Sequence, residues 1–125
     1  MSGLTLDAGA LIAIDKNDRR VVAALRLALD ADLPITSPAG VVGQVWRDGA
    51  RQVRLARLLG STGVAIEALD DARARAAGQL CGTTATNDVT DASVVLCAKA
   101  RGDRIFTSDV DDLRHLDPDV QLEPV

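Results

Sequence analysis

Short apolar runs alternate along this chain with longer segments in which apolar residues recur at helical spacing. The short runs predict five buried strands, and the longer segments predict helices between them. The predicted strands are 3–6, 33–36, 63–66, 104–107 and 120–122. Five predicted helices are 8–15, 19–31, 51–59, 91–101 and 109–116. A further helix is predicted to begin at 37–38 and to end at 48–49. Another begins at 70–71 and is followed by a polar loop at 83–88.

Residues at the ends of several segments favour this assignment. Ser37 and Pro38 are typical of a helix start, with the hydroxyl as N-cap and the proline at the first helical position. Asp70 and Asp71 place negative charge at a helix N-terminus, where the helix dipole favours it. Gly102 is expected as the C-cap of the helix before it.

Strands that alternate with helices indicate a parallel sheet covered by helices on both faces. The sequence contains no internal repeat, low-complexity stretch or linker. Its 125 residues suffice for one sheet and the helices that cover it. We therefore predict an α/β fold in a single domain, residues 1–125.

The composition, 47% hydrophobic and 26% charged, is typical of a soluble globular protein. The apolar run at 11–14 is too short to span a membrane. No positive cluster precedes an apolar stretch, as it would in a secretory signal. We therefore expect a cytoplasmic protein without a membrane segment.

Cysteine and histidine chemistry has few candidates in this chain. Cys81 and Cys97 are the only cysteines and lack the spacing of a metal or redox motif, so we expect them in the core. His115 is the only histidine, which disfavours zinc binding and a Ser-His-Asp triad.

The net charge of −4 at first opposes nucleic-acid binding, because contacts to phosphates need lysine and arginine. However, the kind of acidic residue that carries this charge weakens the argument against nucleic-acid binding. Sixteen of the 18 acidic residues are aspartate, which favours caps and loops over helix interiors. Aspartates at element ends lie where α/β proteins build their sites, and a bound divalent cation would reverse the local field.

Three aspartates are expected to meet at one edge of the sheet. Asp7 follows the first strand and Asp109 follows the fourth, so their carboxylates emerge together if those strands are neighbours. Asp91 begins the helix that leads into the fourth strand, which places it at the same edge. Asp88 and Asp112 each lie three residues from one of these, on the same face wherever the backbone is helical.

Several carboxylates within about 5 Å raise one another's pKa and need a compensating charge. Mg²⁺ or Mn²⁺ suits such an oxygen-rich site and would activate water beside a phosphodiester. A structural interpretation also exists, with Asp91 as a helix N-terminal charge, Asp109 as an N-cap and Asp88 as a loop residue. Asp7 is harder to explain in this way, because a carboxylate that closes an apolar strand is costly to bury unpaired.

Three segments resemble the VapC-type PIN-domain ribonucleases, which are toxins of toxin–antitoxin pairs. Residues 4–12 (LTLDAGALI) resemble the family's opening, 88–95 (DVTDASVV) its later helix start, and 105–109 (IFTSD) its hydrophobic-Thr-Ser/Arg-Asp segment. Their order and spacing agree over nearly the whole chain. The resemblance implies a PIN-like three-layer α/β/α sandwich with a five-stranded parallel sheet, order 3-2-1-4-5, and metal ligands at Asp7, Asp91 and Asp109.

The chain departs from this family at Gln44. Members usually carry a glutamate in the matching helix, whereas an amide brings no charge and cannot act as a base. Either Asp88 or Asp112 supplies the missing charge, or metal binding is weaker, or the protein is a poor catalyst. We favour compensation by Asp88, because it lies close to Asp91. Ser108, in the last of the three segments, is a further candidate site residue.

Arginines supply candidates for contacts with RNA. Arg51, Arg54 and Arg57 recur every three residues along one predicted helix, with Arg47 just before it. They either contact phosphates along the rim of the acidic pocket or form a solvated helix face. With two aromatic residues in the whole chain, the sequence offers no platform for stacking single-stranded bases.

The apolar content of residues 8–31 and 41–59 exceeds what one small sheet must cover, which indicates an exposed groove or a dimer face. The resemblance implies a homodimer. It also implies an antitoxin whose C-terminal segment lies over the acidic site and places an arginine among the carboxylates.

Three functions follow as hypotheses. The leading one is a Mg²⁺- or Mn²⁺-dependent endoribonuclease that acts on RNA as a toxin. The second is a PIN-like domain without catalysis that binds RNA or an antitoxin, with Gln44 as its sign. The third is phosphoryl transfer on Asp7, which needs a nearby lysine, and the only lysines are Lys16 and Lys99.

Overall fold

The computed structural model describes residues 2–125. Its strands are β1 Leu4–Leu6, β2 Ile35–Pro38, β3 Val64–Glu67, β4 Arg104–Thr107 and β5 Leu122–Pro124. Its helices are α1 Ala8–Asp15, α2 Arg19–Asp30, α3 Ala39–Val45, α4 Val53–Leu59, α5 Asp71–Thr84, α6 Val89–Arg101 and α7 Val110–Leu116.

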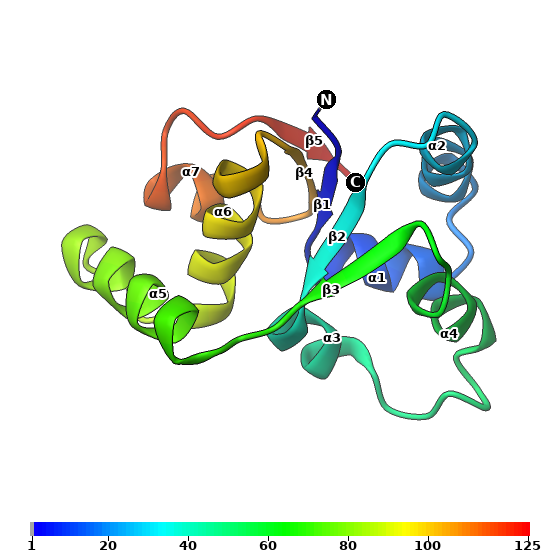
Figure 1. Cartoon of the computed structure of the whole chain (residues 1–125), viewed down its shortest axis with the longest axis horizontal. Helices are drawn as coiled ribbons and strands as arrows, with labels where there is room; N and C mark the ends of the chain where they lie inside the picture. Colours follow the sequence, from blue (N-terminus) through cyan, green and yellow to red (C-terminus); the bar gives the residue numbers. More distant parts are fainter. Residues whose placement is uncertain (1) are drawn as a thin grey trace.

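The five strands form one parallel sheet in the order β3-β2-β1-β4-β5. Leu4 pairs with Ile35 of β2, and Leu6 pairs with Phe106 of β4. Helices α5, α6 and α7 lie on one face of the sheet, and α1, α2 and α4 lie on the other (Figure 1). The predicted α/β architecture and strand order are confirmed, and β1 and β4 are neighbours, as a shared site requires.

The middle of the sheet is buried on both faces, so β1 and β2 are buried at every position, including their polar residues Thr5, Thr36 and Ser37. Leu6 and Ile105 are fully buried, as are Val94 and Val95 of α6, which packs on the sheet. Helix α6 ends at Gly102 with φ of 68°, a conformation that glycine adopts without strain, as predicted. Within residues 2–125, no helix is both long and apolar enough to cross a bilayer.

The predicted start of the third helix is wrong. Strand β2 extends through Ser37 and Pro38, which pair with Ile66 and Glu67 of β3. This pairing joins segments that are distant in sequence, so the residues around Ser37 do not indicate it. Ser37 is fully buried and its Oγ donates to the carbonyl oxygen of Leu6 at 3.0 Å, so it caps no helix. Pro38 is itself the N-cap, and α3 begins at the next residue.

The third helix also ends at Val45, short of the predicted end at 48–49, and the remaining element ends differ from the prediction by at most two residues. Helix α6 begins at Val89 rather than at Asp91, because Asp88 accepts a hydrogen bond from the backbone N–H of Asp91 at 2.9 Å and caps the helix. Helix α5 continues to Thr84, so the predicted polar loop is shorter. These shifts leave the three predicted metal ligands near the ends of their elements.

Candidate active site

The predicted site residues stand at the edge where β1, β4 and α6 come together. Asp7 directly follows β1, Asp109 lies two residues beyond β4, and Asp91 lies in the first turn of α6. Asp88 is the N-cap of α6, and Asp112 lies in the first turn of α7. We call these five residues the acidic edge.

Asp7 is 2% exposed and is the N-cap of α1. Its Oδ1 accepts a hydrogen bond from the N–H of Ala10 at 3.1 Å, and its Oδ2 accepts one from the hydroxyl of Thr107. Burial raises the pKa of Asp7, the two hydrogen bonds lower it, and the charge of Asp109 raises it. The carboxylate is therefore held in one orientation with a second negative charge nearby.

Thr107, which is not among the site residues predicted from the sequence, joins the ends of β1 and β4. Its buried hydroxyl donates to Asp7 and accepts a hydrogen bond from the N–H of Asp109 at 2.8 Å. The next residue, Ser108, lies over α1, since a Cβ added at Gly9 would stand 2.1 Å from its Oγ. The sequence feature that could have identified Thr107 is a hydroxyl-bearing residue at the end of a predicted strand, two positions before an aspartate.

Asp91 carries the strongest electrostatic sign of a functional site. Burial and the charges of neighbouring aspartates raise its pKa to about 7. Burial is the largest cause, followed by the charges of Asp88, Asp109, Asp112 and Asp7. The structure thus brings the acidic edge together closely enough for every other member to act on Asp91. A carboxyl group that titrates near neutral pH for these reasons is typical of a functional site.

Gln44 lies on a helix that borders the acidic edge. A Cβ added at Gly40 of α3 would stand 3.6 Å from the Oγ1 of Thr90, so α3 approaches the first turn of α6. Thr90 adjoins Asp91 in sequence. Gln44 lies one helical turn beyond Gly40 and is exposed.

The predicted RNA-contact residues are exposed. Arg47 donates to two carbonyl oxygens at the end of α3, at 3.1 and 2.7 Å. The side chain of Arg51 is 89% exposed and its Nε lies 3.7 Å from a carboxylate oxygen of Asp48. Arg54 lies on α4. Their exposure is compatible with phosphate contact and with a solvated helix face alike.

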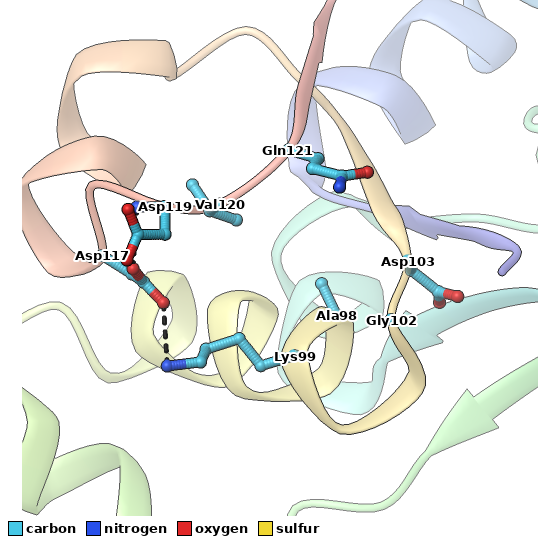
Figure 2. A pocket seen from close by; sticks show the side chains of 8 residues that line it. All are labelled: Ala98, Lys99, Gly102, Asp103, Asp117, Asp119, Val120 and Gln121. Atoms are coloured by element: carbon cyan, nitrogen blue, oxygen red, sulfur yellow. Dashed lines mark hydrogen bonds and ion pairs between the residues drawn. The ribbon is translucent and has the colours of Figure 1, made fainter.

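Both lysines lie away from the acidic edge. Lys99, in the last turn of α6, pairs with Asp117 at 2.9 Å beside a cavity of about 240 Å³ (Figure 2). Helix α6 is about 20 Å long, so Lys99 stands near the far end from Asp91. Lys16 is the C-cap of α1, about 13 Å along that helix from Asp7. Phosphoryl transfer on Asp7 is therefore not supported.

The cysteines and the histidine have structural surroundings. Cys81 and Cys97 are buried and free, as expected for core residues. Burial raises the pKa of the Cys97 thiol to about 11, which keeps it protonated. His115 Nε2 lies 2.6 Å from the carbonyl oxygen of Thr84 and so links α7 to the end of α5.

The acidic edge supplies oxygen ligands of the kind that Mg²⁺ and Mn²⁺ prefer. Within residues 2–125, no three His, Cys, Asp or Glu side chains already have the arrangement of a metal site. Oxygen atoms of Asp7 and Asp88 are engaged in hydrogen bonds to protein groups, and the like charges repel one another. The raised pKa of Asp91 marks uncompensated negative charge that a hard cation would relieve. The donor set therefore fits such an ion chemically, but it is not a ready-made cage.

The sequence matches no protein-family model and no curated protein, but several solved structures share the fold. A chain of VapBC2 from Rickettsia felis, bound to a fragment of promoter DNA, has a TM-score of 0.69 at 17% identity over 98% of each chain. A chain of FitAcB from Neisseria gonorrhoeae has a TM-score of 0.61 at 19% identity over 95% of each chain. VapC20 from Mycobacterium tuberculosis, a toxin that cleaves the sarcin–ricin loop, has a TM-score of 0.60 at 19% identity, over 88% of this chain and 94% of that one.

These similarities establish the architecture. The chain has the PIN-like α/β/α fold shared by these VapC-type proteins, as its three sequence segments predicted. At identities of 17–19% the similarity shows the fold alone. The function has to follow from the acidic edge and its surroundings.

Proposed function

We propose that this chain is a metal-dependent endoribonuclease that hydrolyses RNA phosphodiester bonds as the toxin of a toxin–antitoxin pair. The observation that carries the proposal is the acidic edge, where burial and four neighbouring aspartates raise the pKa of Asp91 to about 7. The similar fold of VapC20, a toxin that cleaves the sarcin–ricin loop, supports it.

Asp7, Asp91 and Asp109 would hold Mg²⁺ or Mn²⁺, and Asp88 would add the negative charge that Gln44 lacks. When bound, such an ion would supply an activated water and neutralise charge on the phosphate. Because Asp91 titrates near pH 7, cation binding is expected to release a proton and to tighten as the pH rises.

Other groups of the chain would orient the ligands and the RNA. Thr107 donates its hydroxyl proton to Asp7 and keeps that carboxylate in one orientation. The exposed side chains of Arg47, Arg51 and Arg54 would contact phosphates and offset the negative charge of the chain.

Cation binding and RNA cleavage test the proposal together. Calorimetric titration of EDTA-treated protein with Mn²⁺ should show binding that tightens between about pH 6 and 8 and is lost in Asp91→Asn. RNA cleavage should require the same ion and fail in that variant. Asp111→Asn, an exposed first-turn aspartate of α7 outside the acidic edge, is the matched control and should retain both. Full-rate cleavage in EDTA or in Asp91→Asn would overturn the proposal.

The second candidate is a domain that binds RNA or an antitoxin without cleavage. It is favoured by the amide at Gln44 and by the lack of a ready-made metal cage within residues 2–125. Under this alternative, Gln44→Glu should create ion-dependent cleavage in an otherwise inactive chain. Compensation by Asp88 predicts instead that Asp88→Asn lowers the ion affinity of an active chain. Asparagine preserves the N-cap of α6, so this variant isolates the charge.

An antitoxin and a second copy of the chain are the proposed partners. A groove of about 380 Å³ between α2 and α4 is lined by aliphatic residues and by Arg26, Arg54 and Arg57, with one acidic residue, Asp30. These features suit an antitoxin segment that combines apolar and acidic residues. Binding of a co-expressed antitoxin should weaken in Arg26→Glu, a change in the groove at an arginine that is not proposed to contact RNA.

Sedimentation of the purified chain tests the proposed homodimer. The cytoplasmic location stays a prediction.

A further inference from the structure

Trp46, the only tryptophan of the chain, is the C-cap of α3. It is 38% exposed, although it is the largest apolar residue in the sequence. A Cβ added at Gly49 would stand 2.8 Å from Cζ2 of the indole, so the Gly49 backbone supports part of the ring. We call residues 46–52, between α3 and α4, the platform loop.

Gln52 holds the platform loop in one conformation. Its Oε1 accepts hydrogen bonds from the N–H groups of Arg47 at 2.7 Å and Asp48 at 3.0 Å. Its Nε2 donates to the carbonyl oxygen of Val45 at 3.0 Å and to the carboxylate of Asp15 at 3.3 Å. The amide therefore joins the end of α3 to α1 and α4. A loop organised in this way loses little conformational entropy when it binds a ligand.

The platform loop and the helix after it are positively charged in an acidic protein. Residues 46–57 contain four arginines and one aspartate, whereas the whole chain has a net charge of −4. All four arginines are exposed. An exposed aromatic ring among arginines can stack an unpaired base and contact its phosphates.

The platform loop lies about one short helix length from the acidic edge, at the end of α3 and beside Asp15 at the end of α1. Helix α3 begins directly after β2, and its seven residues span about 10 Å. The start of α3 approaches α6 at Gly40 and Thr90, next to Asp91. Figure 1 shows the loop leaving α3 at the end of the sheet where α1 and α6 begin. A short single strand can therefore extend from the ring of Trp46 to the acidic edge.

We infer that the platform loop binds single-stranded RNA, with one unpaired base stacked on Trp46 and adjacent phosphates contacted by Arg47 and Arg51. The inference rests on the proposed function and deepens it by naming the form of the substrate. Duplex RNA does not fit, because its bases are stacked within the helix and offer no free face. A stacking platform is not predicted from the sequence, because the order of residues does not show that one ring stays exposed on a rigid loop.

Trp46 fluorescence gives a direct test, because no other tryptophan contributes to the signal. The EDTA-treated full chain is titrated with octauridylate and, separately, with a blunt RNA hairpin. The single strand should quench the fluorescence saturably, and the hairpin should leave it unchanged. The inference is wrong if the single strand causes no quenching.

Variants at Trp46 separate stacking from packing. Trp46→Ala should weaken the affinity for labelled octauridylate about tenfold, the loss of one stacked base. Trp46→Phe should recover most of that affinity, because a π face remains. Leu27→Ala is the control, since Leu27 is 71% exposed on α2, away from the platform loop. Equal affinities of Trp46→Ala and Leu27→Ala would contradict the inference.

The salt dependence of binding tests the arginine contacts. Arg51→Ala should reduce the slope of log affinity against log salt by about 0.7, the loss of one contact to a single-strand phosphate. Arg75→Ala is the matched control, because Arg75 is 82% exposed and pairs with Asp71 much as Arg51 pairs with Asp48. Equal slopes for the two variants would count against the phosphate contact.

These measurements distinguish failure of the inference from failure of the nuclease proposal. Trp46-dependent RNA binding without ion-dependent cleavage would refute the nuclease and keep the inference. Ion-dependent cleavage, together with RNA binding that is unchanged in Trp46→Ala, would support the nuclease and refute the inference. A sedimentation coefficient that changes in Trp46→Ala while RNA affinity does not would make the loop a contact between two copies, and the inference would be wrong.

Discussion

Replacing Asp91 with asparagine should stabilise the cation-free protein above neutral pH. The pKa of Asp91 rises from its ordinary value of 3.8 to about 7 in the folded state, so the folded chain binds the proton more tightly than the unfolded chain. Wild-type stability should therefore fall as the pH rises from about 4 to above 7. Asparagine carries no titrating proton and escapes this loss.

The size of the effect follows from the same pKa values. The difference between 3.8 and about 7 corresponds to roughly 4 kcal/mol at 1.36 kcal/mol per pKa unit. Asp91 is partly exposed, and solvent screening reduces this to about 1–2 kcal/mol. The dipole of α6 favours the lost charge by about 0.5 kcal/mol. The net gain at pH 8 is therefore about 1 kcal/mol, or about 3–5 °C in Tm.

Thermal unfolding in EDTA at pH 5 and pH 8 measures this gain. Asp91→Asn should exceed wild type at pH 8, with a much smaller difference at pH 5. Asp111→Asn, the first-turn control on α7, should show no such pH-dependent gain. Saturating Mn²⁺ should raise the Tm of wild type more than that of Asp91→Asn. A variant no more stable than wild type at pH 8, or equally stabilised at both pH values, would refute the reasoning.

Three further substitutions probe the frame around the acidic edge. Thr107→Val should cost about 2–3 kcal/mol in urea unfolding and lower ion-dependent cleavage, because it leaves Asp7 without its hydroxyl donor, whereas Thr107→Ser should restore both. Asp103→Ala should cost about 2–4 kcal/mol, because two donors at the start of β1 lose their acceptor, yet cation affinity in the folded protein should not change. Gly9→Ala should impair cleavage, because the added Cβ displaces Ser108, while a circular dichroism spectrum like that of wild type would show that the fold survives.

The α/β sheet could be predicted because short, mostly apolar segments alternate with longer segments of helical spacing. The strand order came from the resemblance of three segments and not from periodicity, since local spacing does not say which strands are neighbours. Ser37 shows the limit of local signals. Its sequence is typical of a helix N-cap, but pairing with β3 draws it into the sheet and turns its hydroxyl to Leu6.

The sequence by itself determined the elements and the placement of Asp7, Asp91 and Asp109 near their ends, because strand and helix formation depends on nearby residues. Only the tertiary structure decided that Thr107 holds Asp7, a partner 100 positions away, and that the pKa of Asp91 reaches about 7. It also decided that Trp46 stays exposed on a loop held by Gln52. Desolvation, charge repulsion and hydrogen bonding depend on distances in space, which the order of residues does not contain.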